Sequence, residues 1–214
     1  MSPRTAQVQV ARRRTRRMRA ARRRRTALGL LAFAAIVALG ALLLHPLFRT
    51  AVRDLALPLK HEDAIREQAR DKQLDPSLIA GVIYAESKFS DSTSSAGALG
   101  LMQLLPSTAH FIADRSGGTR FTTEDLSTPE INIAYGSWYL RYLLDRYQGN
   151  ELLALAAYNG GMGNVDRWLA DAQTRGQRLR AADIPFPETR AYVERVLEAR
   201  RDYRATYAGE LGLE

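Results

Sequence analysis

Glu86 is the residue of this sequence whose type and position point most directly to catalysis. An apolar stripe at helical spacing precedes it, made of Leu78, Ile79, Val82 and Ile83. Glu86 follows Ile83 by three positions, so it falls on the same stripe. Apolar neighbours and a place near a helix C-terminus both raise the pKa of a carboxyl group, and a protonated carboxyl group can cleave a glycosidic bond as a general acid. The alternative is an ordinary solvated glutamate at a helix end, since buried glutamate is rare.

A run of small residues from Ser94 to Gly100 follows Glu86 and precedes Leu101-Met102-Gln103. Glycine lets a backbone come close to a ligand, while serine and glutamine offer neutral hydrogen bonds suited to sugar hydroxyl and acetamido groups. A flexible Ser/Gly loop would explain the serines but not the apolar residues after them. The run could therefore contact a sugar, with the flexible loop as the alternative.

Tyr158 and Asn159 precede Gly160-Gly161, a glycine pair that we expect to end a helix. A phenol and an amide at such a turn have a rigid, partly exposed position in which they can orient an N-acetyl group or a reacting alcohol. The alternative is a plain helix end with a packed tyrosine. His110 is interpreted as a structural residue of a short helix, so no metal site and no cofactor are predicted.

Several signals predict the helices that would position these residues. Asp75-Pro76 and Thr128-Pro129 each combine a capping side chain with proline at the first helical position. The expected helices are 61–72, one that starts at Asp75, 106–113, 128–147, one that ends at Gly160, and 188–203. Long runs with strand alternation are missing from the sequence, which predicts a mainly α fold.

Four sequence motifs, in order, resemble those of the SLT-type lytic transglycosylases. They are A-E-S-K-F, S-S-A-G-A-L-G-L-M-Q-L-L-P-S-T-A, A-L-A-A-Y-N-G-G-M-G-N-V and I-P-F-P-E-T-R-A-Y-V. The resemblance covers roughly residues 60 to 205. It implies a lysozyme-like, mainly helical domain that cleaves peptidoglycan glycan strands.

The resemblance also assigns roles to individual residues. It implies that Glu86 is the single catalytic acid and later the base. The family's active-site serine precedes the G-A-x-G-L-M-Q block by three residues, which selects Ser94. Ser95 stays open, because the spacing from Glu86 is one residue shorter than in the common pattern. The other implied substrate-binding residues are Met102, which would line the groove, Gln103, Tyr158, Asn159 and Glu188.

The mechanism that the resemblance implies consumes no water. Most glycosidases need a second carboxylate, but here only Asp91 lies near the motif, in a serine-rich segment. The family instead uses the substrate's own acetamido group and C6 hydroxyl, and it leaves a 1,6-anhydro ring on N-acetylmuramic acid. Two alternatives remain open, a lysozyme-like muramidase that admits water and a non-catalytic cell-wall-binding or assembly protein.

The charge of the chain is concentrated at its N-terminus. The formal net charge is +8, yet the first 25 residues contain 11 arginines and no acidic residue, so the remainder is slightly acidic. Such a tail is typical of a topology determinant that contacts anionic lipid headgroups. No aromatic residue interleaves the arginines, so nucleic-acid binding is not expected. The sequence has no cysteine, which excludes a lipoprotein anchor and any disulfide.

Residues 27–44 carry no charge, and 18 residues of helix span about 27 Å, close to a bilayer core of about 30 Å. The positive-inside rule then places the N-terminus in the cytoplasm and the rest outside. We expect a single-pass protein of the bacterial cell membrane whose catalytic domain lies on the periplasmic or cell-wall side. A cleaved signal peptide is the alternative. The expected organisation is tail 1–26, transmembrane anchor 27–48, connector 49–60, catalytic domain 61–205 and C-terminal tail 206–214; oligomeric state is not predicted.

Overall fold

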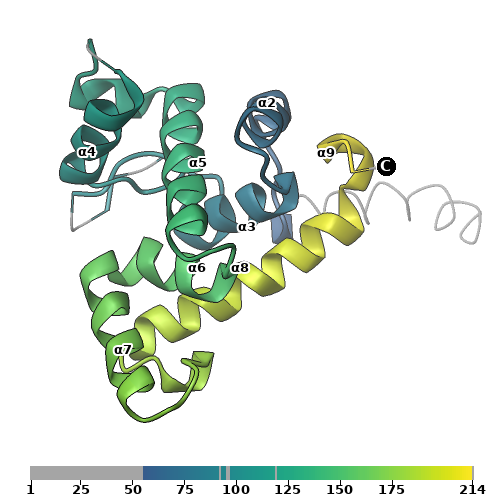
Figure 1. The fold of residues 1–214 in the computed structure, drawn as a ribbon. Coiled ribbons are helices and arrows are strands. Elements are labelled where there is room, and N and C mark those ends of the chain that lie inside the picture. The colour runs from purple at the N-terminus through teal and green to yellow at the C-terminus, as the bar shows by residue number, and fades with distance from the viewer. Residues whose placement is uncertain (1–54, 92, 95–96, 119, 214) are drawn as a thin grey trace, which may run out of the picture. The chain divides into compact units, whose positions relative to one another are not determined.

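The computed structural model of this chain describes residues 55–91, 93–94, 97–118 and 120–213 (Figure 1). The predicted arginine-rich tail 1–26 and transmembrane anchor 27–48 lie outside these residues, and so does Ser95. Within the part of the chain that the structure describes, none of the helices has both the length and the apolar character needed to cross a membrane.

The described chain from Ala56 onward forms one unit built from helices. In order they are α2 (Glu62–Lys72), α3 (Pro76–Ser87), α4 (Pro106–Ser116), the 3-10 helix η1 (Thr123–Ser127), α5 (Pro129–Arg146), α6 (Glu151–Gly160), α7 (Met162–Thr174), the 3-10 helix η2 (Ala181–Asp183), α8 (Pro187–Thr206) and α9 (Ala208–Leu211). Among the described residues the only strand-like feature is an isolated antiparallel bridge between Leu99 and Leu104. The predicted mainly α fold is therefore confirmed.

The helices begin where the sequence signals predicted. Proline occupies the first turn of α3, α4, α5 and α8, and the Asp75 carboxylate accepts a hydrogen bond of 2.9 Å from the Ser77 amide at the start of α3. Some helices differ from the expectation: α4 continues to Ser116, α8 continues to Thr206, and the sequence predicts neither α7 nor α9. A mixed polar and apolar segment after Gly161 had hidden the amphipathic pattern of α7, which buries Val165 and Trp168.

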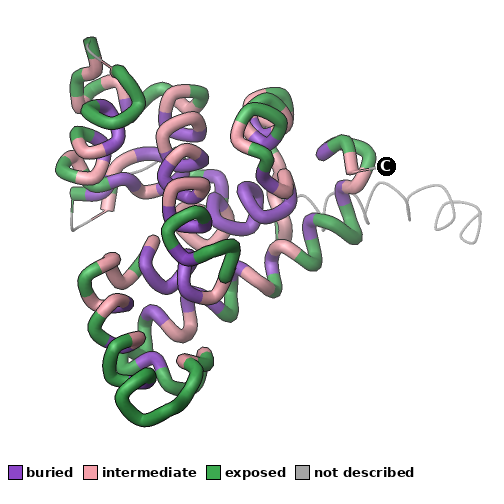
Figure 2. Tube along the Cα trace, in the orientation of Figure 1, coloured by how far each residue is buried: buried purple, intermediate pink, exposed green. Residues whose placement is uncertain are grey.

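The core lies where α3, α5, α6 and α8 meet, with α8 running along α3 (Figure 2). A Cβ atom added to Gly81 of α3 would lie 2.9 Å from the Val196 carbonyl oxygen, so glycine at this position lets the two helix backbones approach closely. Asp75, at the N-terminal end of α3, contacts Arg200 and Arg204, which follow Val196 on α8. The two helices therefore run antiparallel. This packing brings the C-terminal end of α3 close to the N-terminal half of α8.

The folded unit extends beyond the expected limits 61–205 at both ends. Leu57 and Leu59, in the expected connector, pack against the hydrophobic core. Tyr207 and Leu211, in the expected C-terminal tail, are 3% and 1% exposed. Apolar residues at these two places were too few to give a periodic signal, so the sequence pattern did not include them in the domain.

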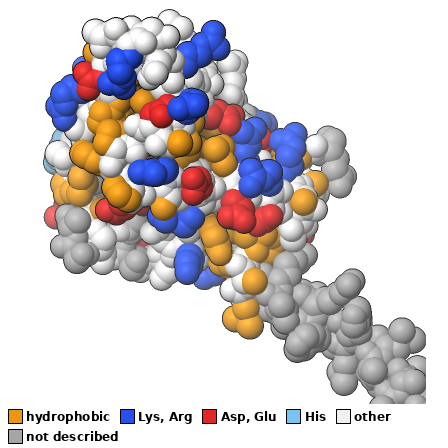
Figure 3. Space-filling model, turned by 90° about the horizontal axis from the view of Figure 1, so that it is seen from below, with side chains coloured by type: hydrophobic (Ala, Val, Ile, Leu, Met, Phe, Trp, Pro, Cys, Tyr) orange, Lys and Arg blue, Asp and Glu red, His pale blue; other side chains and the backbone are white. Residues whose placement is uncertain are grey.

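The surface of the unit mixes charges of both signs. On the face shown in Figure 3, Lys and Arg side chains are interspersed with Asp and Glu side chains, and hydrophobic side chains lie between them. This face carries no large patch of one charge. That agrees with the sequence analysis, in which the excess of positive charge comes from the N-terminal tail.

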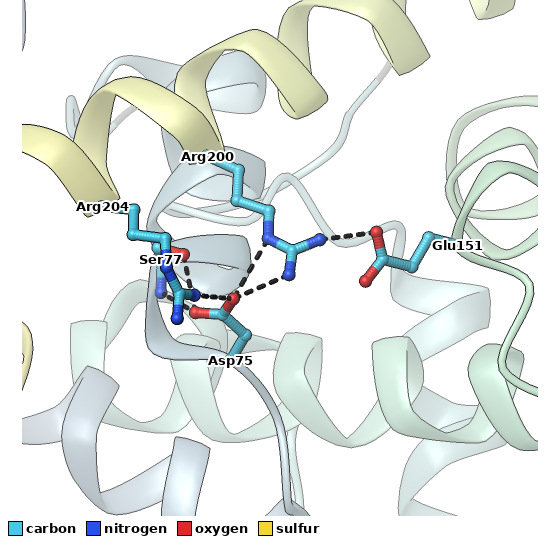
Figure 4. Close-up of polar contacts among 5 residues, drawn as sticks. All are labelled: Asp75, Ser77, Glu151, Arg200 and Arg204. Carbon is cyan, nitrogen blue, oxygen red and sulfur yellow. Dashed lines mark hydrogen bonds and ion pairs between the residues drawn. The ribbon is translucent and has the colours of Figure 1, made fainter. Parts of the chain in front are cut away.

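An ion-pair network ties the N-terminal end of α3 to α8 and α6 (Figure 4). One carboxylate oxygen of Asp75 lies 2.8 Å from Arg200 Nη2 and 2.8 Å from Arg204 Nη1. Arg200 also pairs through Nη1 with Glu151 at 2.6 Å. Burial alone would raise the pKa of Asp75, but hydrogen bonds from Ser77 and Arg200 outweigh it and lower the pKa below the ordinary value of 3.8. The network therefore stabilises the folded state with Asp75 ionised.

Replacing Asp75 with alanine should lower the free energy of unfolding by about 2 to 3 kcal/mol at neutral pH, because a helix cap and a partly buried ion pair are lost together. Asp75→Asn keeps a capping side chain and should cost less. Since the folded pKa is depressed, the contribution of Asp75 is present above its unfolded pKa and is lost as the pH falls through the folded pKa. Urea unfolding at several pH values measures this, and a difference between parent and alanine variant that does not shrink in acid would contradict it.

Candidate active site

Glu86 lies in the last turn of α3, which ends at Ser87, and its side chain is partly buried. Burial disfavours the ionised carboxylate and raises the pKa of Glu86 to about 7, while Tyr192 and Arg195 act in the opposite direction. The upward shift expected from the apolar stripe is therefore confirmed, with burial as its main cause. About half of the molecules would carry a protonated Glu86 near neutral pH.

Two tyrosines enclose the Glu86 carboxyl group from neighbouring helices. Tyr192 of α8 is 1% exposed, and Tyr158 of α6 donates a hydrogen bond of 3.0 Å to the Met102 carbonyl oxygen. Burial raises the pKa of both phenols well above the ordinary value, and the negative charge of Glu86 adds to this shift. The Tyr192 hydroxyl is close enough to lower the pKa of Glu86 by hydrogen bonding, yet it has no partner at regular hydrogen-bond geometry. The contact between Tyr192 and Glu86 is therefore loose.

Asn132 of α5 holds the loop that follows Glu86 in place. Its Oδ1 accepts a hydrogen bond of 2.8 Å from the Met102 amide, and its Nδ2 donates to the carbonyl oxygens of Leu99 and Leu126 at 2.9 and 3.1 Å. Gly100 has a φ of 72°, and a Cβ atom there would lie 2.2 Å from Asn132 Nδ2. The loop can therefore close over Asn132 only with glycine at position 100.

Ser94 and Gln103 lie at the two ends of this loop, and both are partly buried. The Ser94 hydroxyl oxygen accepts a hydrogen bond of 3.0 Å from the Ala98 amide, so its proton is free to be donated elsewhere. Gln103 Nε2 donates to the Gly100 carbonyl oxygen at 2.7 Å. Both side chains are thus oriented by the loop's own backbone.

Met102 does not line an exposed groove in this structure, contrary to the expectation from the family motif. Its side chain is completely buried, and it packs so closely on α5 that a Cβ atom at Gly136 would lie 2.3 Å from its sulfur. Its backbone, however, binds both Asn132 and Tyr158. Met102 therefore supports the site through its backbone amide and carbonyl groups.

Asn159 and Glu188 lie at the exposed ends of α6 and α8. Asn159 Oδ1 accepts a hydrogen bond of 2.8 Å from the Thr189 hydroxyl, which is buried. This bond ties the end of α6 to the first turn of α8. Glu188 is exposed next to Thr189, and none of the described contacts joins its side chain to Glu86.

The sequence pattern does not identify Asn132, Thr189 and Tyr192 as site residues. Tyr192 is buried in α8, and its hydroxyl faces the candidate acid. Asn132 offers one usable signal, since it is a polar residue on the mostly apolar buried face of α5. Among the described residues there is no cluster of three or more metal-ligating side chains.

Comparison with known proteins gives the family. A model of the transglycosylase SLT domain matches residues 63–180. The soluble lytic murein transglycosylase of Salmonella typhimurium is 35% identical over 150 residues, which is 69% of this chain and 23% of that protein. The membrane-bound lytic murein transglycosylase C of Salmonella paratyphi B is 30% identical over 167 residues, 68% of this chain and 46% of that protein.

Solved structures show the same fold. An inactive mutant of the lytic transglycosylase Slt from Pseudomonas aeruginosa is 35% identical with a TM-score of 0.65, over 72% of this chain and 25% of that one. The 70-kDa soluble lytic transglycosylase of Escherichia coli is 31% identical with a TM-score of 0.67, over 75% and 26%. The chain thus spans about a quarter of the length of these relatives. Since the family model covers more than half of the sequence, the chain belongs to the transglycosylase SLT domain family.

Proposed function

We propose that this chain is a peptidoglycan lytic transglycosylase that cleaves the β-1,4 bond between N-acetylmuramic acid and N-acetylglucosamine and leaves 1,6-anhydro-muramic ends. The observation that carries the proposal is Glu86, a partly buried carboxyl group with a pKa of about 7 at the end of a buried helix. A carboxyl group with such a pKa can donate a proton and take one back within one reaction cycle. The family membership and the names of the relatives support the same reaction.

The reaction would proceed in two steps at the muramic C1 atom. Glu86 first protonates the glycosidic oxygen, the bond to C1 breaks, and positive charge develops at C1. The substrate's own acetamido oxygen stabilises that charge. The resulting Glu86 carboxylate then takes the proton of the C6 hydroxyl, whose oxygen bonds to C1. The departing sugar has gained one proton and Glu86 has regained one, so no water is consumed.

The surroundings of Glu86 favour this route over a two-carboxylate mechanism. Tyr192 and Arg195 are the side chains that shift its pKa, and neither is an acid. Asp91, the acid nearest in the sequence among the loop residues, is exposed. With no second carboxylate acting on Glu86, a nucleophile or base of the usual glycosidase type is missing from its described surroundings.

The groups proposed to bind the glycan strand come from the loop that follows Glu86 and from the ends of α6 and α8. Ser94, with Ser95 as the alternative, would donate its hydroxyl proton to the substrate, and Gln103 would bind a sugar oxygen or amide. Asn159 is exposed and fixed by Thr189. The remaining proposed contacts are Tyr158 on α6 and Glu188 at the exposed start of α8.

Digestion of purified peptidoglycan by the full-length protein tests the proposal. We expect soluble muropeptides with anhydro-muramic ends, identified by mass spectrometry because each is one water lighter than its hydrolytic counterpart. Reducing muramic ends would instead identify a lysozyme-like muramidase. Binding to the glycan without any release would identify a non-catalytic wall-binding or assembly protein.

The activity should fall as the pH rises above about 7. Because the pKa of Glu86 is raised to about 7, the protonated acid predominates below that pH and is lost above it. At low substrate concentration the rate should therefore fall about tenfold per pH unit on the basic side. Initial rates of glycan release between about pH 5 and pH 9 measure this. A rate that stays constant up to about pH 9 would contradict the role of Glu86 as the acid.

We further propose that residues 27–48 hold the protein in the bacterial cell membrane, with the folded unit on the periplasmic or cell-wall side. The support is the uncharged run beside an arginine-rich tail, which is suited to anionic lipid headgroups. One relative is named membrane-bound, while others are named soluble. Membrane fractionation with N-terminal sequencing tests the anchor, since loss of the first residues would identify a cleaved signal peptide.

A further inference from the structure

Three tyrosine hydroxyl groups hold three consecutive carbonyl groups just before α2. Tyr84 donates to the Ala56 carbonyl oxygen at 3.2 Å, and Tyr207 donates to that of Leu57 at 2.7 Å. Tyr203 donates to the Pro58 carbonyl oxygen at 2.5 Å. We call residues 56–59 the N-terminal brace. The three hydroxyls come from α3 and from the end of α8, so the brace connects two helices that are distant from it in sequence.

The three rings form a packed cluster behind the brace. Tyr203 is completely buried and Tyr207 is 3% exposed. The Tyr203 ring lies 6.0 Å from that of Tyr84, edge to face, and 5.7 Å from that of Tyr207, stacked. Leu57 and Leu59 of the brace pack against the hydrophobic core. The brace is therefore bound by both hydrogen bonds and apolar contacts, which is more than a connector requires.

The brace contacts the helix that carries Glu86. Tyr84 precedes Glu86 by two residues, and two residues on an α-helix point about 200° apart. The last turn of α3 is therefore held between the brace on one face and the candidate site on the other.

The exit from α3 depends on the same cluster. Lys88 and Phe89 both have positive φ angles, 52° and 60°. Residues other than glycine rarely adopt this conformation, and packing must hold them in it. The Phe89 ring is 2% exposed and lies 5.8 Å from the Tyr203 ring. Tyr203 thus links the brace to the sharp turn that ends the helix directly after Glu86.

We propose that the N-terminal brace, through Tyr84 and Tyr203, is a positioning element that keeps the last turn of α3 closed and Glu86 shielded from water. Neither tyrosine is placed among the substrate-binding groups, so both act through Glu86. The inference rests on the proposed function for its effect on catalysis, but its effect on the Glu86 side chain can be measured without any activity.

The expected effect follows from which groups act on Glu86. Tyr192 and Arg195 approach it from α8, and Tyr158 lies close on α6. None of these three side chains belongs to the brace or to its tyrosine cluster, so loosening the brace leaves them in place. Loosening the brace instead gives water more access to the last turn of α3. Because water stabilises the carboxylate, the pKa of Glu86 falls.

The test compares the full-length protein with the double variant Tyr84→Phe/Tyr203→Phe, in which both rings remain and only the two hydroxyls are lost. Tyr147→Phe is the matched control, because it also removes a buried hydroxyl, one that donates to Asp166 at 3.1 Å on α7. The pKa of Glu86 is read from the carboxyl-carbon NMR signal that disappears in Glu86→Gln. The pH dependence of glycan release is measured in parallel.

We expect the pKa of Glu86 to fall by about one unit in the double variant and to stay unchanged in the control. With a fall of that size, the protonated fraction drops about eightfold at about pH 7.5 and only by about a tenth at about pH 5. Glycan release should therefore fall severalfold at the higher pH and hardly at the lower one. A plain loss of folded protein would lower both rates by the same factor.

An unchanged NMR titration of Glu86 in the double variant would overturn the inference, as would equal losses of activity at both pH values. If the parent protein releases no glycan at all, the proposed function fails, but the NMR titration still decides whether the brace shields Glu86. The two failures are therefore distinguishable.

Discussion

Replacing Glu86 with glutamine should reduce glycan release at least ~100-fold and leave the fold intact, because an acid that also acts as the base contributes about 100- to 10,000-fold to a reaction of this kind. Glutamine has nearly the same size and keeps a hydrogen-bonding side chain near Tyr192. The circular dichroism spectrum and the melting temperature should stay close to those of the parent protein. Mass spectrometry of released muropeptides measures the activity.

The matched control for this prediction is Asp91→Asn. Asp91 is exposed and does not influence the pKa of Glu86, so its removal should leave the rate within about twofold of the parent. A large loss in the Asp91 variant would indicate a second catalytic carboxylate and contradict the single-acid mechanism. Full activity in Glu86→Gln would contradict it more directly.

Replacing Asn132 with alanine should lower the free energy of unfolding by about 3 kcal/mol, because it leaves one amide and two carbonyl groups without partners in the interior. Asn132 is completely buried, and its three hydrogen bonds fix Leu99, Met102 and Leu126. For a domain of this size the melting temperature should fall by about 6 to 12 °C. Glycan release should fall as well, since the loop beside Glu86 loses its support.

Ser137→Ala is the control on the same helix. Ser137 is also completely buried, but its hydroxyl has no hydrogen-bond partner in the structure. Its removal should therefore change the melting temperature by no more than about 2 °C in either direction. Equal effects of the Asn132 and Ser137 substitutions would show that the polar contacts of Asn132 do not hold the loop.

The sequence predicted those parts of the site that depend on local pattern. The apolar stripe from Leu78 to Ile83 sufficed to place Glu86 on a buried helix face, and the cap and proline at Asp75-Pro76 marked where that helix begins. Both depend on residues within one or two turns of each other. The raised pKa of Glu86 followed from the same pattern, because burial is its main cause.

The parts that the sequence did not predict depend on contacts between distant residues. Asn132 binds backbone groups some 30 residues away, and Tyr203 binds a carbonyl group 145 residues away. No local spacing indicates such bonds. The burial of the Met102 side chain was likewise not predictable, since a methionine beside a glycine-rich loop fits a groove and a core equally well. The anchor predicted for residues 27–48 lies outside the described residues and stays a prediction.

The most direct test of the proposed reaction is to digest peptidoglycan with the full-length protein in water enriched in heavy oxygen. A transglycosylase closes the muramic ring with the substrate's own C6 oxygen, so the released ends should be anhydro-muramic and should contain no heavy oxygen. Heavy oxygen at C1 of reducing muramic ends would show that water attacks, and it would contradict the non-hydrolytic mechanism proposed for Glu86.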